Sequence, residues 1–328
     1  MSKFSRRQLL ARAAALAAAT AASDAVLAQA GYPSRPIHYV CPYPPGGTND
    51  LVSRVVSKRL QALLGQPLVV DNKGGAGGTL GTDHVARAPA DGYTLLNASS
   101  GNLTSAPQII GAPYSPFQDF VPVGFLGHVR FVFAAHPSLG VNTLDELIAL
   151  ARRQPGRINY GTAGNGTGGH IAGEYLKLRT GIDLVHVPYR GSALALQDAV
   201  GGHVQLVLDP LAASYVRSGA LKGLAYSGAT SAPDLPGVPQ IDQTSVPHWE
   251  ATNFFLAAVR ASTPGDVVEK LHQAFLALAR DPEVTGELQA LGVEIKPLSR
   301  DEISRLLRTE TTVNDRVIKA AGIPLAQA

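Results

Sequence analysis

Residues 36–65 read PIHYVCPYPPGGTNDLVSRVVSKRLQALLG. A short β-rich run at 36–41 leads into a loop that is rich in proline and glycine. The apolar residues that follow the loop repeat with the period of a helix, and Gly65 and Pro67 end that helix. A strand, a loop and a helix in this order are the building unit of α/β folds, so this stretch sets the expected fold class.

The same alternation continues along the chain. Further strands are predicted at 68–71, 93–96, 131–135, 158–160, 184–187 and 205–208. Helices are predicted at 79–87, 143–152, 169–178 and 192–200, and three more begin near residues 263, 281 and 299. At the first of these three, Thr263 is the expected N-cap and Pro264 the first helical residue. Strands separated by helices predict parallel sheets with helices on both faces.

The first 30 residues form a targeting segment rather than part of the fold. Lys3, Arg6 and Arg7 precede an Ala/Leu-rich stretch, and small residues offer cleavage after Ala28 or Ala30. This is the pattern of a secretory signal, and residues 5–10 (SRRQLL) match a twin-arginine signal. Because the stretch is shorter than the roughly 20 apolar residues of a membrane span, we expect export to the periplasm without membrane insertion of the mature chain.

Charge and cysteine content narrow the class of protein. The whole chain carries a net charge of +3, and residues 1–28 hold four basic residues and one acidic residue, also +3. The mature chain is therefore close to neutral, and the basic character gives no reason to expect a nucleic-acid partner. A single cysteine, Cys41, excludes an intrachain disulfide, and about 300 mature residues suffice for two domains.

The loop after the first predicted strand, residues 42–50, is the first candidate ligand site. Its glycines allow a ligand to approach the backbone, and the N-terminus of the following helix favours an anion. We expect Asp50 to point back and fix the loop or the helix start; the alternative is a plain turn with Thr48 as the N-cap. The candidate ligand-binding residues here are Tyr43, Pro45, Gly46, Gly47, Thr48 and Asp50.

A second glycine-rich loop occupies residues 73–81 (KGGAGGTLG). No Gly-Lys-Ser/Thr sequence closes it, so it does not fit a phosphate-binding loop. Two interpretations stay open, a tight connection that brings a helix close to a sheet and a direct ligand contact.

A third loop, residues 160–170, contains Gly164, Gly166 and Gly169 in the G-x-G-x-x-G spacing, and Asp183 lies 19 residues after the first of these glycines. This nominal dinucleotide fingerprint supports an alternative, an exported nucleotide-dependent oxidoreductase that uses Gly164–Gly169. However, Asp183 precedes the next strand instead of ending it. Short hydrogen-bonding side chains beside a helix start suit a carboxylate better. The candidates are Thr162, Asn165, Thr167 and His170, the last as a helix-capping residue.

Two further strand ends complete the candidate site. Tyr189 and Arg190 follow one strand and precede a helix, and Asp209 ends the next strand. The Arg190 guanidinium could pair with a carboxylate. The sequence has no G-x-S-x-G or H-E-x-x-H motif, and its histidines are scattered. We therefore expect no catalytic residue, metal or cofactor, and we interpret the chain as a binding protein rather than an enzyme.

Five long stretches together resemble one known family. They are YPSRPIHYVCPYPPGGTNDLVSRVV (32–56), VVDNKGGAGGTLGTDHVARAPADGYTLL (69–96), INYGTAGNGTGGHIAGEYLK (158–177), VHVPYRGSALALQDAVGGHVQLVLD (185–209) and TPGDVVEKLHQAFLALARDPEVTGELQALGVE (263–294). In these stretches the chain resembles the periplasmic receptors of tripartite tricarboxylate transporters, the Bug-type solute-binding proteins. It departs from the family pattern at 227–230 and 240–248, and in 255–262 the glycine expected before Thr263 is missing.

The resemblance implies a two-lobed α/β fold of the periplasmic-binding-protein type II (Venus flytrap) class, with a ligand cleft between the lobes. One lobe would comprise residues 31–131 and 253–328, and the other residues 132–252. The implied ligand is a small organic carboxylate, namely a di- or tricarboxylate, an acidic amino acid or an aromatic acid. Lobe closure would capture it for a membrane transporter or a sensor. The resemblance places residues 44–50 and 97–101, including Ser99, opposite residues 162–170, 189–191 and Asp209.

Overall fold

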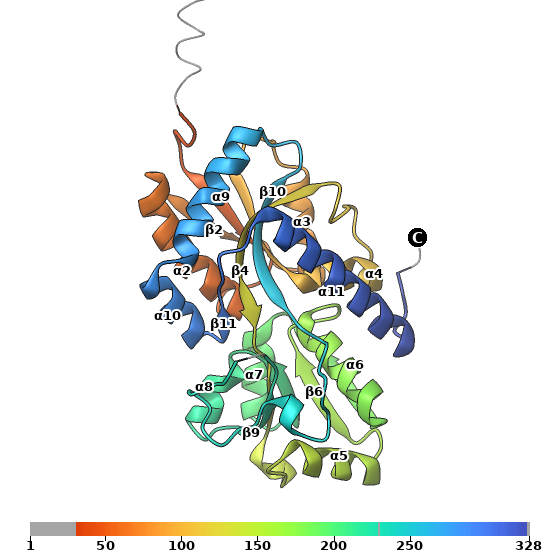
Figure 1. Cartoon of the computed structure of the whole chain (residues 1–328). Coiled ribbons are helices and arrows are strands. Elements are labelled where there is room, and N and C mark those ends of the chain that lie inside the picture. Colours follow the sequence, from red (N-terminus) through yellow and green to blue (C-terminus); the bar gives the residue numbers. More distant parts are fainter. Residues whose placement is uncertain (1–30, 229, 327–328) are drawn as a thin grey trace, which may run out of the picture.

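A computed structural model describes residues 31–228 and 230–326. The predicted signal at 1–30 lies outside the described residues. The chain forms two α/β lobes, one above the other in Figure 1, and each lobe is built on one β-sheet. Below, the first lobe is the one around the six-stranded sheet, and the second lobe is the one around the five-stranded sheet. The boundaries predicted for the lobes in residue numbers remain a prediction.

The six-stranded sheet has the order β11-β4-β10-β3-β1-β2. Its strands are β1 (Ile37–Cys41), β2 (Leu68–Asn72), β3 (Thr94–Ser99), β4 (Phe120–Val129), β10 (Phe254–Arg260) and β11 (Val293–Glu294). Strand β1 pairs in parallel with β2 and β3, whereas β10 runs antiparallel to both β3 and β4.

The five-stranded sheet has the order β7-β6-β8-β5-β9. Its strands are β5 (Val132–Ala135), β6 (Ile158–Thr162), β7 (Leu184–Pro188), β8 (Leu206–Asp209) and β9 (Lys222–Tyr226). Strand β6 is parallel to β7 and β8, and β5 is antiparallel to β8 and β9.

The prediction of purely parallel sheets is wrong, because both sheets are mixed. Only two residues separate β4 from β5, so the chain runs from one sheet directly into the other. Strand β10 later returns to the first sheet between β3 and β4, in the opposite direction to β3. Strands β4, β9, β10 and β11 had not been predicted. The return of β10 joins residues far apart in the sequence, and no local pattern reports such a pairing.

Helices cover both faces of the sheets, as predicted. They are α2 (Thr48–Leu64), α3 (Thr79–Ala86), α4 (Ala106–Ile110), α5 (Leu144–Arg153), α6 (Gly168–Thr180), α7 (Ser192–Val200), α8 (Ala212–Arg217), α9 (Gly265–Ala279), α10 (Pro282–Ala290) and α11 (Arg300–Ala320). Asp281 and Ser299 are the N-caps of the helices that were predicted to begin near residues 281 and 299. Thr263 is not an N-cap; Pro264 occupies that position, and helix α9 begins one residue later than predicted.

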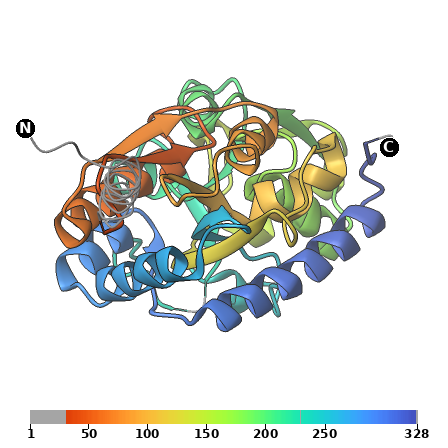
Figure 2. The same ribbon diagram turned by 90° about the horizontal axis from the view of Figure 1, so that it is seen from above.

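Apolar side chains pack on both faces of each sheet. Helices α2, α9 and α10 cover one face of the first sheet, and α3 and α11 cover the other. Helices α5 and α6 cover one face of the second sheet, and α7 and α8 cover the other. Figure 2 shows α11 running along one side of the molecule, and its Val317 and Ile318 pack against Ile171 and Tyr175 of α6. Within the ranges described, no helix combines the length and apolar character that a membrane crossing requires.

Candidate ligand-binding site

A cavity of about 290 Å³ lies where the two lobes meet. The first lobe contributes the loop after β1, the start of α2 and the end of β3. The second lobe contributes the loop after β6, the start of α7 and the end of β8. Phe131, Asn253 and Phe255, at the two points where the chain passes between the sheets, complete the lining. The cavity is therefore built from strand ends of both lobes together with the chain crossings.

Three helices begin at this cavity. Gly47, Thr167 and Gly191 are the N-cap residues of α2, α6 and α7, and none of the three helix starts has a side-chain cap. The first amides of a helix have no carbonyl partner within the helix, and the helix dipole adds partial positive charge there. Three such ends around one cavity create a site that favours a negatively charged group.

Two polar side chains at the start of α2 each have one buried atom without a hydrogen-bond partner among the described residues. Thr48 and Asn49 are each 4% exposed and line the cavity. The Thr48 Oγ1 and Asn49 Nδ2 atoms are buried without a partner, while Asn49 Oδ1 accepts a bond from Cys41 Sγ at 3.0 Å. A buried donor that lacks an acceptor costs about 1–3 kcal/mol. The two side chains can recover this cost by donating to an acceptor in the cavity.

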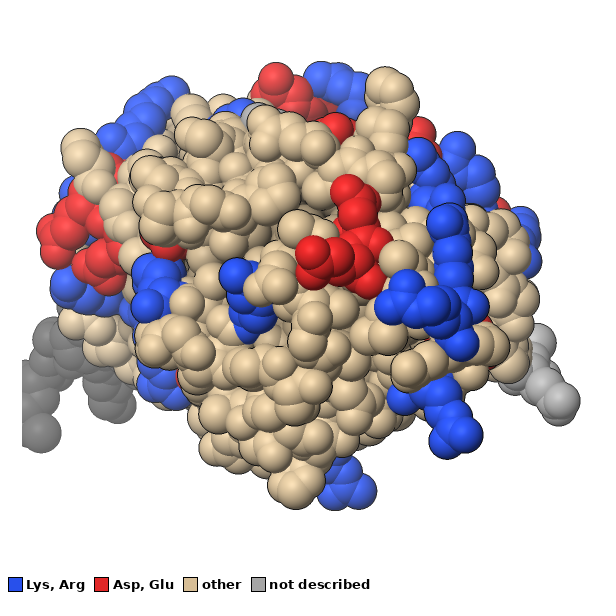
Figure 3. Space-filling model, turned by 90° about the horizontal axis from the view of Figure 1, so that it is seen from below, with Lys and Arg blue, Asp and Glu red and all other residues tan. Residues whose placement is uncertain are grey.

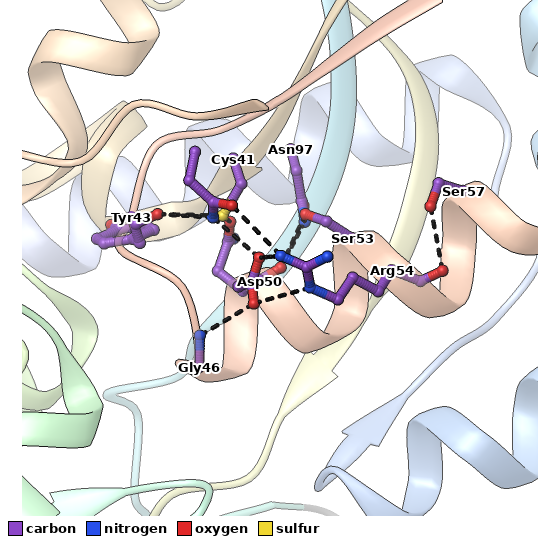
Figure 4. Close-up of polar contacts among 10 residues, drawn as sticks. Cys41, Tyr43, Gly46, Asp50, Ser53, Arg54, Ser57 and Asn97 are labelled. Atoms are coloured by element: carbon purple, nitrogen blue, oxygen red, sulfur yellow. Dashed lines mark hydrogen bonds and ion pairs between the residues drawn. The ribbon is translucent and has the colours of Figure 1, made fainter. Parts of the chain in front are cut away.

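Asp50 holds the loop instead of facing the cavity, as predicted from its position (Figure 4). Its carboxylate accepts bonds from the Gly46 amide at 2.9 Å, from Asn72 Nδ2 at 2.9 Å and from the Arg54 guanidinium at 3.0 and 3.1 Å. Burial by itself raises the pKa of this carboxyl, but the bonds from Arg54, Gly46 and Asn72 outweigh it and lower the pKa of Asp50. Asp50 therefore stays ionised, and the Arg54 guanidinium balances its charge. It does not line the cavity.

Tyr43 and Ser99 form the first lobe's side wall. The Tyr43 hydroxyl lies 2.9 Å from Ser99 Oγ and donates to the Gly77 carbonyl at 3.1 Å. An added Cβ at Gly78 would lie 3.1 Å from the Tyr43 ring, and one at Gly81 would lie 2.6 Å from the Lys73 carbonyl oxygen. The loop at 73–81 therefore packs tightly behind this wall and does not line the cavity, which favours the first of its two interpretations.

Thr162 and His170 lie behind the second lobe's loop. Thr162 Oγ1 is 2.7 Å from His186 Nε2, and His170 Nδ1 accepts from the Gly166 amide at 3.1 Å. The His170 and His186 rings stack at 4.1 Å. Burial lowers the pKa of His170 to about 4 and that of His186 to about 3. Both rings are thus neutral supports of the loop rather than anion partners.

Four other predicted residues of the second lobe differ in position. Asn165 is exposed on the loop and does not line the cavity. The Tyr189 hydroxyl donates to Asp198 Oδ2 at 2.6 Å, away from the cavity lining. Arg190 lines the cavity and is exposed. Asp209 lines it as a buried side chain that accepts from the Leu211 amide at 2.9 Å, and burial raises its pKa to about 6.

The structure brings eight of the 14 predicted residues into the cavity lining. They are Tyr43, Pro45, Gly47, Thr48, Ser99, Thr167, Arg190 and Asp209. The six that lie outside it are Gly46, Asp50, Thr162, Asn165, His170 and Tyr189. Asn49 lies in the range 44–50 expected at the site but was not among the named candidates, although it is the neighbour of Thr48 at a predicted helix start. Phe131, Asn253 and Phe255 line the cavity and lay outside every candidate range.

The dinucleotide interpretation of Gly164–Gly169 requires an acidic residue at the far end of the next strand. Asp183 instead precedes β7, and its carbonyl accepts a bond from the Gly156 amide at 3.3 Å. It therefore lies at the end of β7 opposite to the loop. In addition, no group of three or more His, Cys, Asp or Glu side chains in the described ranges could hold a metal ion.

The comparisons with known proteins fit this geometry. The model of the tripartite tricarboxylate transporter family receptor (TctC) matches residues 52–323. The chain belongs to this receptor family. BugT of Bordetella pertussis is 36% identical over 315 residues, which cover 94% of this chain and 95% of BugT. The family expected from the sequence is thereby confirmed.

Solved structures agree with the receptor fold. Rpa4515 of R. palustris, solved with adipate, is 31% identical with a TM-score of 0.85, and the match covers 90% of this receptor and 99% of Rpa4515. MatC of Rhodopseudomonas palustris, solved with bound malate, is 26% identical with a TM-score of 0.82, and the match covers 88% and 100% of the two chains. The two-lobed periplasmic-binding-protein fold predicted for this receptor is therefore confirmed.

Proposed function

We propose that this receptor captures a small organic carboxylate in the cavity between its lobes and passes it on unchanged. The observation that carries the proposal is the start of α2, where Thr48 Oγ1 and Asn49 Nδ2 are buried without partners beside a helix N-terminus. A carboxylate accepts several hydrogen bonds and carries the charge that such a helix end favours. Rpa4515 and MatC, which were solved with adipate and malate, support a carboxylate as the ligand class.

Capture proceeds by closure of the two lobes on the ligand. Ser105 Oγ of the first lobe donates to the Gly166 carbonyl of the second at 2.6 Å. A Cβ at Gly77 would lie only 2.5 Å from the Asn165 carbonyl oxygen, so the lobes are close at this point. A ligand that touches both lobes stabilises this closed arrangement, because it loses its contacts with one lobe when the lobes separate.

The closed receptor then delivers the acid to the membrane components of a tripartite tricarboxylate-type transporter, or to a sensor. We propose a periplasmic location, reached through a twin-arginine signal at residues 1–30. Neither a nucleic acid nor a catalytic reaction is part of this function. Figure 3 shows acidic and basic side chains on the same face of the described molecule, separated by wide uncharged areas, instead of a continuous basic stripe.

Calorimetric titration of the purified protein tests the proposal. The ligands are mono-, di- and tricarboxylates, glutamate and benzoate, and each is compared with its uncharged amide. We expect at least one acid to bind while its amide does not, since the amide lacks the charge. Failure of every acid to bind, or equal binding of acid and amide, would refute carboxylate capture.

A further inference from the structure

We propose that the ligand is a monocarboxylate with an apolar body, an aliphatic chain or an aromatic ring, and that the cavity selects against a second carboxylate. This inference rests on the proposed function, because it assumes that the first carboxylate binds at the start of α2. It goes further by assigning the charge and the shape of the remainder of the ligand.

The formal charges of the side chains that line the cavity cancel in the absence of a ligand. Among the described residues, Arg190 and Asp209 are the only charged side chains in the lining. Arg54, on α2 behind the first loop, is already paired with Asp50 at 3.0 Å. The three helix ends and the Arg190 guanidinium are the positive groups available to the first carboxylate. Arg190 is the only side-chain cation in the described lining, and because it is exposed, solvent screens its attraction for a second negative charge.

Asp209 is placed to oppose a second carboxylate. It is 3% exposed at the end of β8 and forms no ion pair with any described residue. Its carboxylate accepts from the Leu211 amide at 2.9 Å. An anionic group of the ligand that reached the end of β8 would lie near this carboxylate, which no described cation neutralises in an ion pair. Two carboxylates at such a site disfavour each other's ionised form.

The remaining walls suit an apolar body. Phe131 and Phe255 line the cavity near the two points where the chain crosses between the lobes, and Leu208 lines it at the end of β8. Leu194, on α7, lines the cavity although 47% of it is exposed. Pro44 and Pro210 add apolar surface from the two lobes. A ligand anchored by its carboxylate at α2 would lay its body against these side chains and remove them from water.

Hexanoate and adipate test the inference, because they share a six-carbon chain and differ in the second carboxylate. In calorimetric titrations we expect hexanoate to bind at least about tenfold more tightly, since a like charge shifts ionisation by about one pKa unit or more. Asp209→Asn should bring the two affinities closer together. Asp301→Asn, which removes the same charge from the exposed first turn of α11, should leave their ratio unchanged.

Each result has a distinct meaning. Adipate binding as tightly as hexanoate, or more tightly, overturns the inference and leaves carboxylate capture intact. If no acid of the wider panel binds, the proposed function itself fails. If Asp209→Asn does not fold, as judged by circular dichroism, benzoate and terephthalate are compared in the unmodified protein. Preference for terephthalate then overturns the inference, and preference for benzoate supports it.

Discussion

The proposed capture of a carboxylate rests on two buried atoms at the start of α2, Thr48 Oγ1 and Asn49 Nδ2. Thr48→Val replaces a buried hydroxyl that has no partner with a methyl group of similar size. We expect the ligand-free protein to be at least as stable as the parent, because an unsatisfied polar atom is removed. Ligand affinity should fall by about 1.5–3 kcal/mol, or about 10- to 150-fold in Kd, the range for a hydrogen bond to a charged group.

Thermal unfolding and calorimetry with the best-binding acid measure the two effects of Thr48→Val. Thr312→Val, at an exposed position on α11, is the matched control and should change affinity little. A Thr48→Val protein that is less stable but binds normally would show that the hydroxyl serves the fold and not the ligand.

Arg190 illustrates the effect of exposure on an ionic contact. It lines the cavity but lies in solvent, where water and salt screen a charge pair. We expect Arg190→Ala to weaken acid binding by no more than about 1 kcal/mol. The loss should shrink further between low and high salt in paired titrations. A much larger, salt-independent loss would mean that the bound ligand shields the guanidinium from solvent.

The stacked His170 and His186 rings predict a loss of stability in acid. Burial depresses both pKa values, to about 4 and about 3, whereas an unfolded histidine titrates near 6.5. The unfolded chain therefore binds protons first, and the stabilising effect, full above about pH 6.5, is lost as the pH falls toward 4. Between pH 7 and pH 5 we expect each ring to contribute a loss on the order of 2 kcal/mol, and the two together about 4 kcal/mol, in the free energy of unfolding.

Urea unfolding at pH 7 and pH 5 measures this loss. His186→Phe keeps a ring in the stack and removes one titrating group, so its stability should fall less over the same interval. The exposed His84, replaced in the same way, is the control. If His186→Phe and the parent lose equal stability, another group causes the acid sensitivity.

Individual site residues were predictable where their function depends on local structure. Thr48, Thr167 and Gly47 follow from a loop and a helix start, and all three line the cavity. Phe131, Asn253 and Phe255 were not predictable, because they reach the cavity only through the crossing of the chain between the lobes. Thr162 and His170 were predicted as ligand residues, but their polar atoms are taken by His186 and Gly166.

Among the elements, the loop before α2 shows how closely the two lobes approach. Gly47 has φ of −85°, which any residue adopts, and a Cβ there would lie 3.8 Å from Ser192 of α7. We expect Gly47→Val to fold normally while its methyl groups press on Ser192 and hinder closure. Crowding of this kind costs about 1–3 kcal/mol, which should appear as weaker ligand binding.

Circular dichroism and calorimetry separate folding from closure in the Gly47→Val protein. Gly265→Val, at the first residue of α9, introduces the same side chain where nothing lies within 4 Å of the new Cβ. That control should bind as the parent does. Unchanged affinity in a folded Gly47→Val protein would exclude this loop from the closing contact.

Helices and parallel strands were predictable at the element level because their patterns are local. Ser299 and Asp281 cap the helices that their sequence contexts predict. Strand β10 was missed because its residues are almost all buried, so it lacks the alternation that identifies a strand with one exposed face. Its partners β3 and β4 lie more than 100 residues earlier in the chain.

For the whole molecule, the proposed capture makes the affinity depend on the balance between open and closed lobes. Ser105→Ala removes the 2.6 Å bond to the Gly166 carbonyl, a contact that exists only when the lobes are together. A hydrogen bond of this kind contributes about 0.5–1.5 kcal/mol net, so we expect the Kd for the acid to rise about 2- to 10-fold.

Small-angle X-ray scattering monitors closure directly. The radius of gyration of the parent should decrease when the acid is added, and Ser105→Ala should need more acid for the same decrease. Ser304→Ala, on α11 in the first lobe, changes an intrahelical bond only and serves as the control. A radius that does not respond to the ligand would contradict capture by closure.

The position of β10 also determines the order in which the two lobes of the newly made chain can complete their folding. All five strands of the second sheet lie between residues 132 and 226, so that sheet needs nothing from elsewhere. The first sheet cannot close until residues 254–260 have been synthesised, because β10 fills the place between β3 and β4. Domains generally fold as units during synthesis. The part of the receptor that leaves the ribosome first is therefore the part that waits longest for its final partner strand.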